Sequence, residues 1–276
     1  MINLEENKNQ TVKTYSPWEK VLICRHPKRP HAKDYISYIT DDFFELKGDR
    51  YFKDDSAIIG GIGLISGKKF MIIGQEKGNS TETRLYHNFG MPSPEGYRKA
   101  LRLMELAEKF EIPVLCLIDT PGAFPGLGAE ERGQGRAIAD NLFKMSRIKT
   151  PIIALVIGEG CSGGALGIAV ADKIAMLEHS YYSVISPEGC ASILWKDASK
   201  SPEAAKSLKM HAEDLHNFKM IDKILKEPEG GAHLAPEEMM ESVKSYIIEQ
   251  YQILRNYSSH DLVELRYKKF RTLGDH

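Results

Sequence analysis

The sequence has no long apolar run, no signal-peptide pattern in its first residues and almost no net charge. Its longest apolar stretches, such as residues 151–157, fall well short of the ~18 residues that a membrane-spanning helix needs. The first ten residues are acidic and polar, without the basic and apolar parts of a signal peptide. The formal net charge of −1 gives no general attraction for nucleic acid. We therefore expect a cytoplasmic protein that uses no membrane and recognises its partners at local sites.

The sequence also lacks paired cysteines and phosphate-binding motifs. Its four cysteines, at positions 24, 116, 161 and 190, form no C-x-x-C pair, so neither a zinc ribbon nor any other metal site is predicted, and reduced thiols are expected. Gly67-Lys68 does not stand at the spacing of a P-loop, and no G-x-G-x-x-G opens a helix. Leu208-Lys209-Met210 is not the Met-Lys-Met of a biotinylated lysine. The chain is thus expected neither to bind ATP through a P-loop nor to carry biotin itself.

What is present is an alternation of strand and helix patterns. β-branched apolar runs bounded by glycine or proline predict strands over residues 57–65, 69–75, 113–119, 151–157 and 173–177. Apolar residues at helical spacing, or proline after a capping residue, predict a helix that begins at Ser93-Pro94, one from Gly163 to Ala171, and others over 130–147, 187–195, 202–209, 212–218, 236–256 and 261–273. Such alternation favours an α/β architecture. Because no linker interrupts the chain, we expect a polar tail over residues 1–16 and a single domain over 17–276 that ends in helices.

Residues 25–30, Arg-His-Pro-Lys-Arg-Pro, form a basic stretch near the N-terminus. Its two prolines exclude a long helix through this region. A run of charge of this kind is usually a solvated face, and that is the expectation here.

Two glycine-rich loops, residues 119–126 and 158–165, each follow a buried strand. Ligands of open α/β sheets gather beyond the carboxyl ends of strands. Gly163 and Gly164 would lie on the first turn of a helix, where the N–H groups lack partners and the helix dipole adds positive charge. Such amides suit a developing oxyanion, for which one donor is worth about 3–4 kcal/mol. The alternative is that small residues merely let the helix pack closely on a strand.

The second loop also fits the pattern of a nucleophile elbow. Residues 160–164 read G-x-S-x-G between a strand and a helix, which would make Ser162 the nucleophile of a serine hydrolase. Such a serine needs a base, usually a histidine held by a third group. None of the later histidines lies in a turn or strand end that looks built to hold it, so the hydrolase remains a minor alternative.

Long stretches of the chain resemble the α subunit of acetyl-coenzyme A carboxylase carboxyltransferase. The matching stretches occur in the family's order and span residues 17 to 234: 25–30, 46–50, 88–100, 118–126, 129–134, 157–166, 182–197 and 230–233. The resemblance implies a crotonase-like fold, a ββα superhelix related to Clp proteases, with active sites formed between subunits. By analogy, the amides of the two loops bind oxyanions, and the same loops contact biotin; the implied catalytic residues are Gly122, Ala123, Gly163 and Gly164, and the implied biotin-binding residues are Phe124, Pro125, Gly160 and Ser162.

The resemblance further implies a reaction and its partners. The carboxyl group of carboxybiotin, borne on a separate biotin carboxyl carrier protein, is transferred to acetyl-CoA to give malonyl-CoA, the first committed step of fatty acid synthesis. A zinc-ribbon β subunit binds most of the acetyl-CoA, an α2β2 assembly is formed, and biotin carboxylase belongs to the wider complex. The stretch 79–87 departs from the more basic pattern common in the family, which puts phosphate or carrier contacts there in doubt.

Proteins with other functions share the crotonase-like fold that the resemblance implies. Clp-type proteases place a histidine after the strand that follows the glycine-rich helix, and residues 184–187 contain none. Enoyl-CoA hydratases use two glutamates, for which Glu159 and Glu188 are candidates. A subunit of a biotin-dependent decarboxylase differs from a carboxyltransferase only in its acyl-CoA and sodium dependence. A silent scaffold subunit would keep full activity after changes at Gly122 or Gly164.

Overall fold

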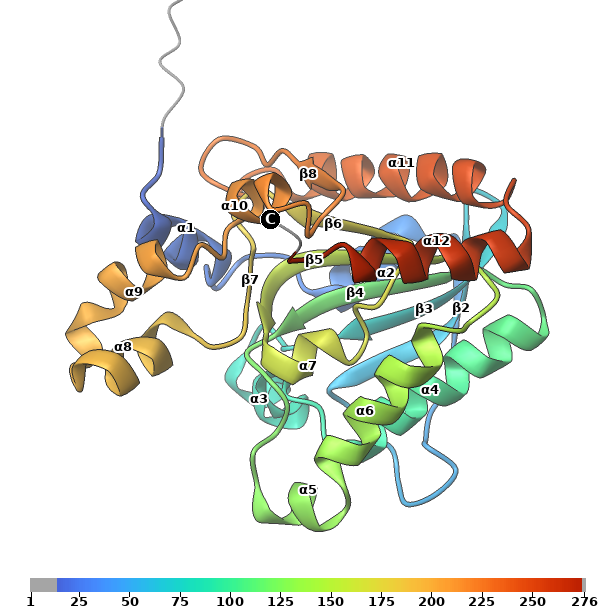
Figure 1. Ribbon diagram of the computed structural model, residues 1–276, viewed down its shortest axis with the longest axis horizontal. Coiled ribbons are helices and arrows are strands. Elements are labelled where there is room, and N and C mark those ends of the chain that lie inside the picture. The colour runs from blue at the N-terminus through green and yellow to red at the C-terminus, as the bar shows by residue number, and fades with distance from the viewer. Residues whose placement is uncertain (1–13, 275–276) are drawn as a thin grey trace, which may run out of the picture.

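A twisted sheet organises residues 14–274, the part of the chain described by this computed structural model (Figure 1). Within these residues the sheet has eight strands in the order β1-β2-β3-β4-β5-β6-β8, and β7 pairs with the far end of β5. β1, β2 and β3 are antiparallel neighbours, and every pairing from β3 onward is parallel. The strands are β1 Asp42–Glu45, β2 Ile58–Ile65, β3 Lys68–Gln75, β4 Val114–Thr120, β5 Ile152–Cys161, β6 Lys173–Leu177, β7 Tyr181–Ser183 and β8 Lys223–Leu225.

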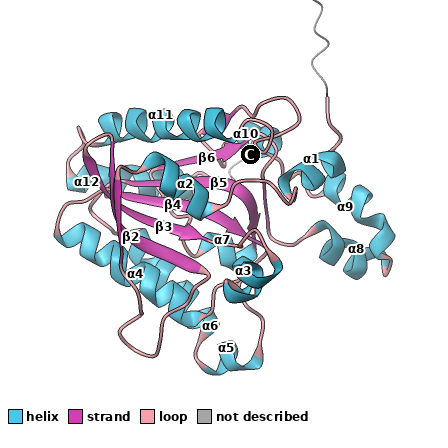
Figure 2. Cartoon of the chain, turned by 180° about the vertical axis from the view of Figure 1, so that it is seen from behind, coloured by secondary structure: helices cyan, strands magenta, loops and turns pink. Residues whose placement is uncertain are grey.

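Helices cover both faces of the sheet. α4 and α6 lie in front of it in Figure 1, and α2 lies in front of it when the molecule is seen from behind in Figure 2. The helices are α1 Pro17–Cys24, α2 Ala32–Ile39, α3 Thr81–Tyr86, η1 Asn88–Gly90, α4 Pro94–Lys109, α5 Leu127–Glu131, α6 Gln134–Met145, α7 Ser162–Leu166, α8 Pro187–Trp195, η2 Ala198–Lys200, α9 Ser201–Ser207, α10 Ala212–Asn217, α11 Pro236–Leu254 and α12 Ser259–Arg271.

The two central strands, β4 and β5, are buried along their whole length. Successive side chains of a strand point to opposite faces, so Cys116 and Ile118 join the core under α4 and α6, while Leu115 and Leu117 join the core under α2 and α11. This explains why both strands read as continuous apolar runs rather than alternating ones. Their carboxyl ends carry the two glycine-rich loops.

The predicted α/β class and the five predicted strands are confirmed, but two predicted helices are wrong in extent. The expected helix over 130–147 is broken between α5 and α6, because Gly133 adopts a left-handed conformation with φ of 83°. The helix expected from Gly163 to Ala171 ends at Leu166. Gly167 follows it and packs against the ring of Tyr97, where a Cβ would lie 2.8 Å from the ring carbon Cε1.

The expectation of a solvated basic stretch at residues 25–30 is also wrong. Arg29 is buried and forms two hydrogen bonds with Glu227, of 2.7 and 2.8 Å. Arg25 reaches Glu159 and Glu188, as described below. These partners lie more than a hundred residues away along the sequence. α1 and α2 flank the stretch, so its prolines do separate two short helices.

The remaining features concern the ends and the surface. Most of the predicted polar tail, residues 1–13, lies outside the described residues, and Ser16 already caps α1 by accepting a hydrogen bond from the Glu19 amide. α8 and α9 extend to one side of the sheet (Figure 1). Val184, Ile193 and Leu194 in and before α8 are 76%, 69% and 66% exposed. Within residues 14–274, no helix is both long and apolar enough to cross a membrane. The four cysteines are buried and free.

Candidate active site

The two glycine-rich loops touch each other through their backbones. β4 and β5 are parallel neighbours, and their register pairs Thr120 with Gly160, so both loops begin at the same edge of the sheet. A Cβ built on Gly164 would lie only 2.5 Å from the Ala123 amide nitrogen. A Cβ on Gly163 would meet nothing closer than Ile138 Cδ1, at 3.5 Å. Gly164 is therefore required by the close approach of the loops, whereas Gly163 is not.

The amide groups of the two loops differ in their availability. The Gly122 N–H donates to Thr120 Oγ1 at 3.0 Å, so this predicted donor is engaged within its own loop. For the Ala123 N–H, no hydrogen bond is found within residues 14–274. The N–H groups of Gly163 and Gly164 belong to the first turn of α7, where no intrahelical acceptor exists. Because α7 has only 5 residues, its dipole is small, and the amides themselves would contribute most of the stabilisation of a bound anion.

Gln75, at the end of β3, joins the two loops. Its side-chain Nε2 donates to the Gly164 carbonyl at 2.7 Å, and its Oε1 accepts from the Asp119 amide at 3.2 Å. The Tyr97 hydroxyl donates to the same Gly164 carbonyl at 3.2 Å. Gln75 is fully buried, so these bonds fix α7 relative to the start of the first loop. The sequence indicates only that Gln75 ends a strand and gives no sign of this role.

A buried network of charges lies beneath the loops. Lys77 pairs with Asp119 at 2.8 Å and also with Glu159, and thereby links the first residue of one loop to a residue of the other. Arg25 pairs with Glu159 at 2.7 Å and with Glu188 at 2.5 Å. The Glu159 amide donates to Asp119 Oδ1 at 3.0 Å. Lys77 and Asp119 were not predicted as site residues. The sequence feature that could have indicated them is that charged residues lie at or just after the ends of buried strands.

These contacts keep the carboxylates of Glu159 and Asp119 ionised. Burial by itself raises the pKa of Glu159, but Lys77 and Arg25 outweigh it and lower that pKa to about 2. The pKa of Asp119 is likewise lowered, because Lys77 and His31 outweigh the effect of burial. A glutamate that must exchange protons near neutral pH needs a pKa closer to 7. The shift in Glu159 therefore disfavours the hydratase alternative.

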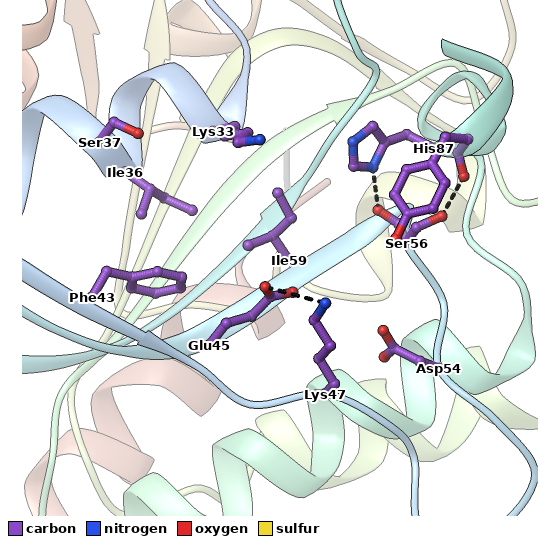
Figure 3. Close-up of a pocket in the computed structure, with 11 residues that line it drawn as sticks. Lys33, Ile36, Ser37, Phe43, Glu45, Lys47, Asp54, Ser56, Ile59 and His87 are labelled. Carbon is purple, nitrogen blue, oxygen red and sulfur yellow. Dashed lines mark hydrogen bonds and ion pairs between the residues drawn. The ribbon is translucent and has the colours of Figure 1, made fainter. Parts of the chain in front are cut away.

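A cavity of about 200 Å³ opens beside the network. We call it the Arg84 cavity; it is lined by Cys24, Arg25, His26, His31, Lys77, Arg84, Phe89, Pro121 and Glu159. A larger cavity of about 290 Å³ lies among α2, β1 and the end of α3, and neither glycine-rich loop lines it (Figure 3). Tyr86 and His87 line this larger cavity, and His87 Nδ1 lies 2.6 Å from the Ser56 carbonyl.

The structure also places the four residues that the resemblance assigned to biotin. Phe124 is half-buried and its N–H donates to the Pro92 carbonyl at 3.0 Å, whereas Pro125 is exposed. Gly160 is buried, and a Cβ there would lie 3.1 Å from the Tyr182 ring. Together with Ser162, these residues belong to the two loops that meet at Gly164, as do the residues expected to be catalytic.

Ser162 is exposed and has a φ of 56°, the left-handed conformation that a nucleophile elbow requires. No hydrogen bond between Ser162 and a histidine is found in the described chain. The conformation of an elbow is thus present without the base that would activate the serine, which disfavours the hydrolase alternative.

Comparison with solved structures identifies the fold. Transcarboxylase 12S with methylmalonyl-coenzyme A bound aligns with a TM-score of 0.67 and 18% identity over 91% of this chain, which spans only 47% of that chain. The β subunit of geranyl-CoA carboxylase from P. aeruginosa aligns with a TM-score of 0.63 and 18% identity, over 85% of this chain and 44% of that one. The expected crotonase-like fold of biotin-dependent carboxyltransferases is therefore confirmed.

Sequence relatives then define the family. Residues 2–274 match the family model described as acetyl co-enzyme A carboxylase carboxyltransferase-like. The chain is 59% identical to the acetyl-coenzyme A carboxylase carboxyl transferase subunit alpha of Protochlamydia amoebophila, over 99% of this chain and 86% of that protein. The subunit of the same name from Chlamydia caviae is 59% identical, over 98% of this chain and 84% of that protein. This chain belongs to the acetyl-coenzyme A carboxylase carboxyltransferase family, as the resemblance indicated, and is a transferase.

Proposed function

We propose that this chain is the α-type subunit of an acetyl-CoA carboxyltransferase, which moves the carboxyl group from carboxybiotin on a carrier protein to acetyl-CoA and so forms malonyl-CoA. The observation that carries this proposal is the backbone contact of Gly164 with Ala123, which brings amides of two loops to one place. Identity of 59% to carboxyltransferase α subunits over nearly the whole chain supports the assignment.

Backbone amides are the chemical contribution of this chain. Carboxybiotin, when bound, supplies the carboxyl group and, once it has lost that group, a base for the methyl proton of acetyl-CoA. The N–H groups of Gly163, Gly164 and Ala123 would stabilise the negative charge that the urea oxygen of biotin acquires as the carboxyl group leaves, before the methyl proton neutralises it and the acetyl-CoA enolate takes up the CO₂. Since Gln75 and Lys77 already hold both loops, the donors need no rearrangement when the charge appears.

The proposed partners supply the acetyl-CoA site and the biotin carrier, which the proposal does not assign to this chain. We propose that a zinc-ribbon β subunit binds most of the acetyl-CoA, that the two chains form an α2β2 assembly, and that the carrier protein and biotin carboxylase act with it in the cytoplasm. The exposed apolar side chains of Ile193 and Leu194 on α8 support association with another polypeptide.

The test compares Gly164→Ala with Gly163→Ala in the assembled complex. We expect Gly164→Ala to lower the rate of malonyl-CoA formation by more than about 100-fold, since its methyl group displaces the first loop and misplaces the donors. Gly163→Ala has room for the methyl group and keeps its N–H, so its loss is smaller. A Gly164→Ala complex that forms malonyl-CoA at the wild-type rate refutes the proposed role of the loops.

A biotin-dependent decarboxylase is the second candidate, because the chain also shares its fold with a Pseudomonas malonate decarboxylase hetero-tetramer, with a TM-score of 0.62 at 13% identity. The two functions predict different assays. A carboxyltransferase makes malonyl-CoA from acetyl-CoA without sodium, whereas sodium-dependent loss of CO₂ from an acyl-CoA as the main activity identifies a decarboxylase.

A further inference from the structure

α3 is a helix that buries none of its own side chains. A surface helix normally packs an apolar stripe on the core, and most of its stability comes from that packing. In α3, which is described throughout, no residue is buried, and Leu85 and Tyr86 are each 64% exposed. Phe89, which follows the helix, is 45% exposed. We call these three exposed apolar side chains, Leu85, Tyr86 and Phe89, the α3 patch.

Polar bonds hold this helix in place of apolar packing. Before its first turn, the Gly78 carbonyl accepts a hydrogen bond of 3.3 Å from Arg84 Nε. At its last residue, the Ser56 hydroxyl donates to the Tyr86 carbonyl, and His87 Nδ1 lies 2.6 Å from the Ser56 carbonyl (Figure 3). These bonds fix the helix without using the apolar side chains of the α3 patch.

The α3 patch stands at the rim of the proposed reaction centre. A Cβ on Gly90 would lie 3.1 Å from the Asp119 carbonyl oxygen. The Phe124 N–H, which follows Ala123 in the chain, donates to the Pro92 carbonyl at 3.0 Å. Figures 1 and 2 both show α3 at the edge of the sheet where α7 begins. The segment that leaves α3 is thus packed on and bonded to the first glycine-rich loop.

We propose that the α3 patch is the docking surface for the carrier protein that bears carboxybiotin. This inference rests on the proposed function and adds the place where that partner binds. Biotin must reach the amides of Ala123 and Gly164 on a tether made of its own valeryl chain and one lysine side chain. Because this tether is short, the folded carrier must touch the enzyme close to these amides. The α3 patch offers exposed apolar side chains there.

The size of the α3 patch favours the carrier over a permanent subunit. A stable subunit interface needs about 800 Å² on each partner and roughly 20–30 residues a side, whereas transient complexes use less. α3 has only 6 residues, so its patch suits a weak contact. A carrier protein must leave after each turnover to be carboxylated again, and weak docking permits this. α8, with exposed Ile193 and Leu194, is the surface assigned above to lasting association.

The experiment uses the complex of this chain with its β subunit and two assays: malonyl-CoA formation with carboxylated carrier protein, and the reverse reaction of malonyl-CoA with free biotin. Free biotin enters the reaction centre but has no protein surface to dock. For the double variant Leu85→Ser with Tyr86→Ser, we expect the KM for carboxylated carrier to rise about tenfold, as for the loss of an apolar anchor. The KM for free biotin stays within about twofold of wild type, because neither glycine-rich loop is changed.

The matched control is the double variant Leu265→Ser with Tyr267→Ser. These side chains of α12 are 47% and 58% exposed, so the same two residue types are lost from the surface. Arg266 of the same helix reaches the Thr150 carbonyl just before β5 begins, at the end of the strand away from the loops. Both KM values are expected to stay unchanged in this control.

Three results overturn the inference. They are an unchanged KM for carboxylated carrier in the α3 variant, equal rises of KM for carrier and for free biotin, and an equal effect of the α12 control. An α3 variant that no longer assembles with the β subunit also overturns it, because α3 would then be a subunit contact. A wild-type complex that forms no malonyl-CoA instead overturns the proposed function, so the two failures are distinguishable.

Discussion

Two buried charge networks lie near opposite ends of β5, and they differ in completeness. At the start of the strand, Arg266 of α12 bonds to Asp172 through Nε and Nη2, each at 2.8 Å, and its remaining donors reach the carbonyls of Met145, Ile148 and Thr150. Asp172 in turn accepts from the Ile152 amide at 2.7 Å. This network has side chains 0% and 5% exposed.

The network at the carboxyl end uses the same kinds of groups but is open. Lys77 and Arg25 keep 13% and 29% of their side chains exposed and line a cavity, next to Arg84. In the Arg266 network all donors are bonded within the chain, so this network holds α12 on the sheet and offers no group to a ligand. The Lys77 network holds the two glycine-rich loops, and because it opens on a cavity its polar groups can also contact a ligand.

Lys77→Met is the strongest test of whether the open network holds the two loops. It leaves Asp119 and Glu159 buried with fewer cations, which costs about 3–5 kcal/mol of unfolding free energy for a broken buried pair. It also removes the ion pairs that link the two loops, so malonyl-CoA formation by the complex should fall more than about 100-fold. Urea denaturation and the activity assay measure the two effects.

Lys226→Met is the matched control for that change. Lys226 pairs with Glu178 at 2.6 Å, but its side chain is 73% exposed, so removing the pair should alter the unfolding free energy by less than about 1 kcal/mol. If Lys77→Met behaved like Lys226→Met in both measurements, the network would have no role in holding the loops.

Arg266→Met tests the closed network. It leaves Asp172 without its guanidinium partner and three carbonyls without their donor, and we expect a loss of about 3–5 kcal/mol in unfolding free energy. The kcat of complexes that still assemble should stay at the wild-type value, because Arg266 is at the far end of the strand from the loops. A fall in kcat at full assembly would show that the two ends of β5 are not independent.

The smallest effect is expected from Glu159→Gln under acid conditions. The pKa of Glu159 is about 2 in the folded chain against an ordinary value of 4.5. Its ionised form therefore stabilises the fold above about pH 4.5, and this contribution is lost as the pH falls towards 2. Glutamine does not titrate, so the slope of unfolding free energy against pH in this window should decrease by up to about 1.4 kcal/mol per pH unit. An unchanged slope would contradict the assigned pKa.

The sheet and the glycine-rich loops could be predicted because their signals are local. β4 and β5 appear in the sequence as continuous apolar runs, and the loops follow directly as runs rich in glycine. The break in the helix at Gly133 could not be foreseen, since a lone glycine is also tolerated inside helices. The loops' roles as donors stay a prediction, and Gly122 shows that a glycine amide in such a loop can already be bonded within it.

The charge network could not be predicted, because its partners come from distant parts of the chain. Arg25 meets Glu159 134 residues later and Glu188 163 residues later, and no spacing rule connects them. Gln75 is similar: it stands at the end of an ordinary strand, and its bond to Gly164 joins residues 89 positions apart. Side-chain partners of this kind emerge only once the strands are aligned.

Backbone packs directly on backbone where Gly164 meets the Gly122–Ala123 peptide. The three atoms nearest to a Cβ on Gly164 are all backbone atoms, which cannot shrink or rotate to absorb a change in either loop. In a mutant library confined to residues 120–126, most substitutions would therefore disturb the packing on residues 160–165, and this loss would mask any change in substrate preference. Attempts to redesign this enzyme for other acceptors should exchange both loops and Gln75 together, because they form one structural unit.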